Sequence, residues 1–226
     1  KNYPESDMEL DQILKQRQSI RKFKNVDIPD SDIEEMVKAA GTAPSGKNIQ
    51  NWYFVAIKQE AAKKAIGEII EKKKEGIARK MDEVDGDKAL RFRKFVKNFT
   101  MFATGAPVLF LVFAENYYPS GYREYELIDA PREVLDDLLY HRSPGMQSIG
   151  ALLQTLSLKA VDMGYGTCWL TSANYAGKEI EDWAEDEGIF NKENYFLAAM
   201  MALGVQEEGA RSPGRKTLEE IYTLIK

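Results

Sequence analysis

An uninterrupted apolar segment at residues 107–113 constrains the fold of this chain more than any other feature of its sequence. A run of this length is too short for a separate helix, and its lack of polar positions is typical of a strand buried on both faces. The segment therefore predicts a central strand of a sheet. Three more segments predict strands of the same protein, at residues 52–57, 167–171 and 195–205.

Helical periodicity fills much of the chain between these strands. Apolar residues at helical spacing predict an amphipathic helix over residues 7–17. A second helix is predicted from about Ser31 to Gly41, with Asp30 or Ser31 as its N-cap. Residues 144–163 are apolar around most of the helix circumference, which indicates a central or interface helix. Two shorter helices are predicted, at residues 177–187 and near Leu218.

A charged stretch at residues 61–104 favours helix and predicts an exposed helical excursion from the body of the protein. Within it, Phe92, Phe95 and Phe99 recur at spacings of three and four. These rings either pack the helix onto the body or cover a binding slot. The chain contains no linker, internal repeat or low-complexity tract outside this stretch, so we predict a single α+β domain over residues 1–226.

Composition excludes several classes of function. The formal net charge is -5, whereas a nucleic-acid-binding protein usually has a basic excess, so we expect no nucleic-acid partner. Cys168 and His141 are the only residues of their types, which argues against a disulfide framework, a metal site and a Ser-His-Asp triad. We expect His141 to be a surface residue. The longest apolar stretches are about half of the ~20 residues that span a bilayer. We therefore predict a cytoplasmic protein without a membrane partner.

A basic cluster, RQSIR at residues 17–21, follows the first predicted helix. Two guanidiniums and a hydroxyl within five residues match the oxygens of a phosphate, because Arg presents planar, forked donors. Arg215 is the expected counterpart near the other end of the chain. The cluster therefore points to a phosphate-bearing cofactor, and the alternative is that Arg17 and Arg21 are solvated surface charges.

Four motifs together carry a resemblance to a known family. They are RQSIR at 17–21, AAGTAPSGKNIQNW at 39–52, GYGTCW at 164–169 and RKTL at 215–218. In this order and spacing they resemble the nitroreductase superfamily of FMN enzymes, over nearly the whole chain. The AGTAPSG stretch is particularly similar to the iodotyrosine deiodinase branch. The resemblance implies a three-layer sandwich with a central mixed sheet flanked by helices. It also implies a domain-swapped homodimer with two FMN sites at the subunit interface.

The resemblance assigns the phosphate end of FMN to the basic cluster. Arg17, Ser19 and Arg215 are the implied phosphate contacts, and Gln18 stands where many relatives have a second Arg. Arg21 matches the position beside flavin N1 and the C2 carbonyl, where negative charge accumulates on reduction. A positive charge at that position makes reduction easier, so Arg21 is one of two implied catalytic residues.

Two other segments are implied to reach the flavin. The first belongs to the other subunit, and its matching residues are Pro44, Ser45, Gly46 and Asn48. The second lies at the redox face near N5 and O4, and its matching residues are Trp169, Leu170 and Thr171, of which Thr171 is the second implied catalytic residue. For Trp169 the alternative is a core position, because an aromatic residue in a buried strand usually packs inside.

The resemblance predicts an FMN-dependent oxidoreductase that works by a ping-pong cycle. NAD(P)H would deliver hydride to FMN N5 and leave, and a small electron acceptor of the nitroaromatic, quinone or halogenated phenol class would take the electrons. Residues 61–104 lack the Tyr that the deiodinase branch carries in its substrate lid, so we do not predict iodotyrosine dehalogenation. Two alternatives remain: a flavin-fragmenting enzyme similar to dimethylbenzimidazole synthase, and a non-catalytic flavin-binding module.

Overall fold

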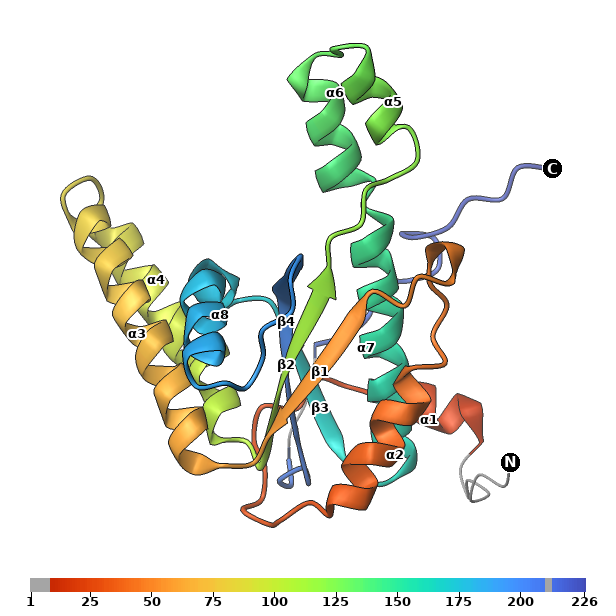
Figure 1. The fold of residues 1–226 in the computed structure, drawn as a ribbon. Helices are drawn as coiled ribbons and strands as arrows, with labels where there is room; N and C mark the ends of the chain where they lie inside the picture. Colours follow the sequence, from red (N-terminus) through yellow and green to blue (C-terminus); the bar gives the residue numbers. More distant parts are fainter. Residues whose placement is uncertain (1–8, 210–212) are drawn as a thin grey trace.

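The structure, a computed structural model, describes residues 9–209 and 213–226. Its centre is a four-stranded sheet in the order β1-β2-β4-β3, and every neighbouring pair of these strands is antiparallel (Figure 1). The strands are β1 (Trp52–Ile57), β2 (Val108–Glu115), β3 (Gly166–Leu170) and β4 (Tyr195–Gly204). The strand predicted from the apolar run is β2, and it lies between β1 and β4 with nearly all of its side chains buried.

Alternate side chains of β2 enter two separate hydrophobic cores. Val108, Phe110 and Val112 face the core that contains residues of α2 (Asp30–Ala40) and α7 (Pro144–Asp162). The intervening residues face the core of the opposite side, formed with α3 (Glu60–Asp82), α4 (Gly86–Phe99) and α8 (Gly177–Asp186). Helices therefore cover both faces of the sheet, as Figure 1 shows, and the predicted three-layer α+β sandwich is confirmed.

The sheet has parallel character only at its margin. Two isolated bridges extend the sheet in the described residues. A parallel bridge joins Ser19 to Thr167 of β3, and an antiparallel bridge joins Phe23 to Gln206. The extended segment after α1 (Leu10–Gln16) thus crosses the end of the sheet from β3 toward the end of β4. This crossing is what places the basic cluster beside β3.

The structure differs from the prediction at the ends of two helices. The N-cap of α2 is Pro29 rather than Asp30 or Ser31, and the Pro29 carbonyl accepts the backbone N–H groups of Asp32 and Ile33. The Asp30 carboxylate bonds instead to the Lys58 ammonium at 2.9 Å, which takes it away from a capping role. The first helix was predicted over residues 7–17, and the structure gives α1 as Leu10–Gln16, while residues 7 and 8 lie outside the described part.

The short terminal helix predicted near Leu218 does not form. A single turn is present there, with the Ile221 N–H donating to the Leu218 carbonyl and the Thr217 N–H to the Glu220 carboxylate. Isolated helices shorter than roughly 12 residues are marginal without tertiary packing. Side chains of residues 213–226 are exposed in this chain, so nothing packs against the turn.

Two helical excursions leave the sandwich (Figure 1). One is the hairpin of α3 and α4, which lies where the charged excursion was predicted: its base packs on the sheet through Ile66, Ile70 and Val96, and only its tip projects beyond the sheet. The other consists of α5 (Tyr122–Leu127), α6 (Arg132–Asp136) and the helical turn η3 (Asp137–His141). His141 is exposed and pairs with Asp137 at 3.0 Å. Short turns η1 (Gly46–Asn48), η2 (Met101–Gly105) and η4 (Asn174–Ala176) connect other elements. Among the helices of the described residues, none combines the length and the hydropathy of a membrane span.

Candidate functional site

The structure brings Arg17 and Arg215 together in one cleft of about 560 Å³, although they come from opposite ends of the chain. Gln18 and Lys15 line the same cleft. The pKa of Arg17 is lowered by burial and then by the positive charge of Arg215. Two guanidiniums and an ammonium line the cleft together with one carboxylate, that of Asp11, and this excess of positive charge favours an anion.

Cys168 of β3 lies beneath the basic cluster. Burial raises the pKa of its thiol, while the Arg21 charge, a hydrogen bond with the Ser19 side chain and the Arg17 charge act in the opposite direction. These effects place Arg17, Ser19 and Arg21 around one position of β3. The net shift favours the protonated thiol, and the Cys168 side chain packs in the core.

Backbone contacts fix the cluster against β3. The Ile20 N–H donates to the Thr167 carbonyl at 2.8 Å, and the Ile20 side chain is almost completely buried. Gly166 makes this approach possible, because a Cβ at that position would lie 2.6 Å from Ile20 Cγ1. In an extended chain, neighbouring side chains point to opposite sides. Burial of Ile20 therefore turns the side chains of Ser19 and Arg21 to the opposite side, where both act on Cys168.

The end of β3 presents alternate side chains outward. Leu170 is buried, whereas Trp169 is 43% exposed and Thr171 is exposed. The Trp169 ring borders α7, where a Cβ added at Gly150 would lie 3.6 Å from it. Trp169 is therefore at the surface of this chain rather than in its core. Leu170 can reach a ligand only through its peptide groups, because its side chain belongs to the core.

The small-residue loop around η1 has an unusual backbone. Lys47, Asn48 and Gln50 have φ of 54°, 54° and 49°, which is the left-handed region. Each such non-glycine position costs on the order of 1–3 kcal/mol and persists only where the surroundings enforce it. The Gln50 N–H donates to the Ser45 hydroxyl at 3.0 Å, and the Gln50 amide donates to the Asn48 side chain at 3.2 Å. The loop is a strained turn held by its own polar residues, a combination that is common at functional sites.

Within a single chain, this loop lies far from the basic cluster. Gly46 lies against Tyr117 and Pro144 at the N-terminal end of α7, and Pro44 belongs to the same loop. Gln18 instead lines a cavity with Val161 and Gly164 at the C-terminal end of α7. With 19 residues, α7 spans roughly 28 Å. Pro44, Ser45, Gly46 and Asn48 are thus separated from Arg17 by the length of a helix.

The sequence did not single out two features that border the predicted residues. Lys15, in the last turn of α1, lines the cleft with Arg17 and Arg215. A basic residue two positions before the cluster was the available signal. The guanidinium carbon of Arg21 lies 5.8 Å from the centre of the Phe99 ring at the end of α4. No sequence pattern relates Arg21 to Phe99, because their contact depends on how α4 packs.

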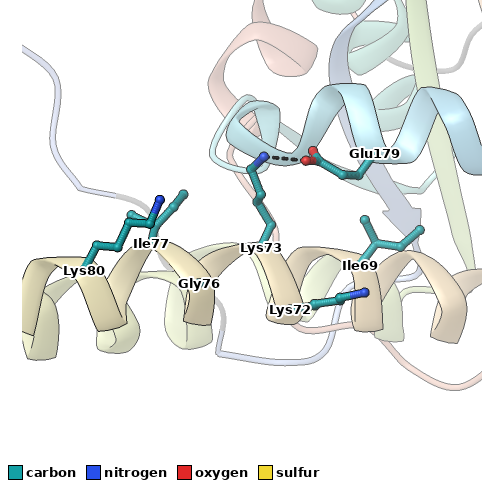
Figure 2. Close-up of a pocket in the computed structure, with 7 residues that line it drawn as sticks. All are labelled: Ile69, Lys72, Lys73, Gly76, Ile77, Lys80 and Glu179. Carbon is teal, nitrogen blue, oxygen red and sulfur yellow. Dashed lines mark hydrogen bonds and ion pairs between the residues drawn. The ribbon is translucent and has the colours of Figure 1, made fainter.

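A second cleft, of about 630 Å³, lies between α3 and α8 (Figure 2). Figure 2 shows Lys73 of α3 pointing toward Glu179 of α8, and the two form an ion pair. The lining residues are Ile69, Lys72, Lys73, Gly76, Ile77, Lys80 and Glu179. None of the residues predicted from the motifs lines this cleft, so we place the candidate site at the basic cluster and the end of β3.

Sequence comparisons relate the chain to the nitroreductase family and to iodotyrosine deiodinases. The family model described as Nitroreductase family matches residues 14–205. Iodotyrosine deiodinase of Nematostella vectensis is 30% identical over 225 residues, which is 93% of this chain and 73% of that protein. Iodotyrosine deiodinase of Hydra vulgaris is 38% identical over 104 residues, which is 45% of this chain and 37% of that protein. The match to the mouse deiodinase covers 41% of that protein, so several curated relatives are aligned over less than half of their length.

Solved structures give a second comparison. A BluB-like flavoprotein from Clostridium difficile 630 is 57% identical, with a TM-score of 0.92 over 97% of this chain and 100% of that one. A nitroreductase with bound FMN from Bacteroides fragilis NCTC 9343 is 19% identical, with a TM-score of 0.68 over 97% of this chain and 100% of that one. At that lower identity the likeness concerns the fold.

Proposed function

The chain belongs to the nitroreductase family, and from that membership we propose that it is an FMN-dependent oxidoreductase with a single FMN-binding domain over residues 1–226. The observation that carries the proposal is the convergence of Arg17 and Arg215 on one cleft. Their forked donors match a phosphate monoester with two negative charges. Gln18, in the same cleft, and Ser19, beside it, add uncharged hydrogen-bonding groups.

We assign the flavin end of the cofactor to Arg21 and the end of β3. Bound FMN would supply reversible two-electron redox chemistry at this position. The Arg21 guanidinium would stabilise negative charge at the N1 and C2 carbonyl edge, which favours reduction. The peptide groups of Trp169 and Leu170 and the hydroxyl of Thr171 would serve as donors toward the N5 and O4 edge. The outward positions of Trp169 and Thr171 support this assignment.

The proposed cycle is ping-pong. NAD(P)H would bind at the open end of β3, give up a hydride and leave, and a small oxidised acceptor would then enter the same position. Nitroaromatics, quinones and halogenated phenols are the acceptor classes we propose. Iodotyrosine is not among them, because residues 61–104 contain no Tyr to match that of the deiodinase lid.

We further propose that the working form is a homodimer in which each FMN site uses two chains. The separation of Gly46 from the basic cluster by the length of α7 supports this, because a loop from a second chain would complete the site. The end of the chain also runs outward from the body (Figure 1). Its exposed apolar residues are suited to burial on a partner, and they are Leu218, Ile221, Tyr222, Leu224 and Ile225.

A second candidate function is oxygen-dependent fragmentation of the bound flavin, as in the dimethylbenzimidazole synthase branch of the superfamily. One observation favours it: the similarity to a BluB-like flavoprotein, at 57% identity and a TM-score of 0.92, exceeds the similarity to the FMN-bound nitroreductase described above. In that case the same FMN contacts would hold a flavin that is consumed rather than recycled.

An anaerobic absorbance titration of the purified protein with NADH and NADPH tests the proposal. Loss of the oxidised flavin absorbance at one reductant per FMN, and its return when an acceptor is added, is the expected result. A colourless protein that takes up no FMN would overturn the proposed function. Admission of air to the reduced protein separates the two candidates, because recovery of intact FMN indicates a reductase and formation of a benzimidazole product indicates fragmentation.

A further inference from the structure

Three phenylalanines of α4 have two different environments. Phe92 packs edge-on against Tyr175, with ring centres 5.6 Å apart, and it contacts the core. Phe95 and Phe99 are 46% and 48% exposed, although their rings lie side by side with centres 5.5 Å apart. Phe92 is therefore a packing residue, whereas Phe95 and Phe99 form an adjacent pair of solvent-exposed rings, the open pair. Two open rings side by side form a surface suited to another apolar or aromatic group.

The open pair lies next to the candidate site. The Thr100 hydroxyl donates to the Ser172 hydroxyl at 2.7 Å, and the Ser172 hydroxyl donates to the Phe99 carbonyl at 3.4 Å. These bonds tie the end of α4 to the residue that follows Thr171. From the other side, the Arg21 guanidinium lies 5.8 Å from the Phe99 ring centre. Phe99 thus lies near Arg21 through its ring and is tied to the residue after β3 and Thr171 through its backbone carbonyl.

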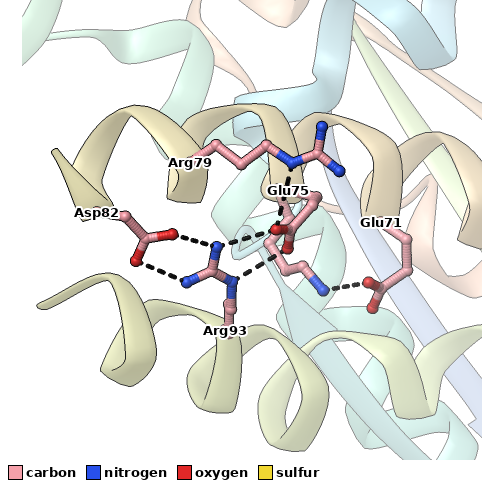
Figure 3. A network of polar contacts seen from close by, with 6 residues as sticks. Glu71, Glu75, Arg79, Asp82 and Arg93 are labelled. Carbon is pink, nitrogen blue, oxygen red and sulfur yellow. Dashed lines mark hydrogen bonds and ion pairs between the residues drawn. The ribbon is translucent and has the colours of Figure 1, made fainter. Parts of the chain in front are cut away.

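A network of ion pairs centred on Arg93 joins the two helices of the hairpin (Figure 3). Arg93 of α4 donates to both carboxylate oxygens of Glu75 at 2.9 and 3.1 Å, and to both of Asp82 at 2.7 and 3.0 Å. Paired bonds of a planar guanidinium fix direction as well as distance. Because Glu75 and Asp82 belong to α3, they fix α4 against α3 and thereby the side on which Phe95 and Phe99 lie.

Positive charge lies at both ends of the open pair. Arg91, Phe95 and Phe99 follow one another at intervals of four residues, so they share a face of α4. Arg91 is exposed at one end of this row, and Arg21 lies at the other. A flat ring with a negatively charged substituent complements two aromatic faces between two guanidiniums.

We propose that Phe95 and Phe99 form the aromatic wall of the acceptor subsite and select planar aromatic acceptors that carry a negative charge. This inference rests on the proposed function, because it places the wall beside the flavin. Phe95 and Phe99 are specificity residues in this scheme, and they take no part in holding the FMN phosphate.

The test is binding of three probes to the oxidised, FMN-loaded protein in the absence of a reductant, measured by the shift of the flavin absorbance spectrum. The probes are 4-nitrobenzoate, uncharged nitrobenzene and non-aromatic cyclohexanecarboxylate. Stacking on two rings is worth about tenfold in affinity, so we expect the Phe95→Ala/Phe99→Ala variant to bind 4-nitrobenzoate roughly tenfold more weakly. Phe99→Leu should lose part of this affinity, since it keeps apolar volume without a ring face. Leu90→Ala is the matched control, because Leu90 is 49% exposed on the same helix.

The outcomes separate this inference from the proposed function. A protein that binds no FMN overturns both. FMN-loaded protein that binds 4-nitrobenzoate no more tightly than cyclohexanecarboxylate overturns the aromatic wall alone. Equal affinity of the double variant and of Leu90→Ala for 4-nitrobenzoate also overturns the aromatic wall. The aromatic wall is supported if the Phe95→Ala/Phe99→Ala variant loses affinity for 4-nitrobenzoate while its FMN affinity and thermal unfolding midpoint stay unchanged. The preference for a negative charge is supported if the parent protein binds nitrobenzene more weakly than 4-nitrobenzoate.

Discussion

The guanidiniums of Arg17 and Arg215 lie close together, so that the pKa of Arg17, lowered first by burial, is lowered further by the positive charge of Arg215. Both side chains line one cleft, and Asp11 is the single carboxylate among the residues that line it. Two like charges held together in this way repel each other until an anion joins them. The arrangement is therefore more favourable with a phosphate bound than without one.

Replacement of Arg215 by Ala should weaken FMN binding by about 1.5–3 kcal/mol, the range for a hydrogen bond to a charged group. Fluorescence titration of the apoprotein with FMN measures the loss. Riboflavin lacks the phosphate, so its affinity should be the same in the variant and the parent. Lys216→Ala changes the next exposed basic residue and should leave FMN affinity unaltered. Equal weakening of FMN and riboflavin would remove Arg215 from the phosphate site.

Replacement of Arg21 by Gln should make the bound flavin harder to reduce. Removal of a positive charge destabilises the reduced, more negative form, so the midpoint potential falls. A contact of about 1.4 kcal/mol corresponds to a shift of roughly 30 mV for two electrons. Spectroelectrochemistry measures the potential, and Lys22→Gln, an exposed neighbour, is the control. A potential that rises, or one equal to that of the control, would contradict the assignment of Arg21 to the flavin edge.

Gly166→Ala should destabilise the protein, because the new Cβ would lie 2.6 Å from Ile20 Cγ1. Overpacking of this kind costs about 1–3 kcal/mol, which urea unfolding measures. Gly76→Ala is the contrasting control, since a Cβ there meets nothing within 4 Å. Ala in place of Gly inside a helix stabilises by roughly 0.5–1 kcal/mol. The cost of Gly166→Ala should shrink in an Ile20→Ala background, and an unchanged cost would show that the contact with Ile20 is not its cause.

The sequence located the strands and the long helix closely, because their apolar patterns are strong and local. The predicted helix over residues 144–163 corresponds to α7 (Pro144–Asp162), and the apolar run at 107–113 corresponds to most of β2. The sequence failed where a distant partner decides the outcome. Asp30 bonds to Lys58 instead of capping α2, and the turn at Leu218 has nothing to pack on.

The candidate site shows the same limit. The motif at residues 17–21 indicated three side chains that the structure places around Cys168. The contact of Arg21 with Phe99 depends on the packing of α4, and the separation of Gly46 from Arg17 depends on the direction of α7. Neither is encoded in a local pattern, so only the folded chain reveals them.

Replacement of Arg93 by Gln should reduce the acid sensitivity of the protein. Hydrogen bonds from Arg93 are the main cause that lowers the pKa of Glu75 and of Asp82 below their ordinary values of 4.5 and 3.8. Carboxylates with a lowered folded-state pKa stabilise the fold above those ordinary values, and this contribution is lost as the pH falls through the lowered pKa. We expect the free energy of unfolding to fall less steeply below pH 4.5 in Arg93→Gln.

Urea unfolding at several pH values from neutral to below the ordinary pKa of Asp measures that slope. Arg79→Gln is the matched control, because the Arg79 side chain is exposed and lies 3.7 Å from Glu75. It should retain most of the pH dependence. If both variants keep the slope of the parent protein, the Arg93 network is not its source.

Mixed dimers provide the sharpest check of a site shared between two chains. An Arg17→Ala/Arg215→Ala chain lacks the phosphate contacts, and a Gly46→Trp chain carries a bulky residue in the loop that we place against the partner's FMN. The Gly46 Cβ position lies 3.5 Å from the Tyr117 hydroxyl, which is ordinary contact. The thermal unfolding midpoint of the Gly46→Trp homodimer, compared with that of the parent, shows whether the fold also accepts the larger indole. Each homodimer should bind FMN poorly. If each FMN site uses two chains, one site of a mixed dimer contains the substitutions of both chains, and the other site contains no substituted residue.

Co-expression of the two chains with different affinity tags, followed by sequential purification on both tags, isolates the mixed dimer. We expect about one tightly bound FMN for every two chains, with the affinity of the parent protein, because one site is rebuilt from intact residues of both subunits. If cluster and loop instead served the same site within a single chain, every site of the mixed dimer would carry a lesion. FMN affinity would then stay as low as in the two homodimers, and the proposed sharing of the site would be wrong.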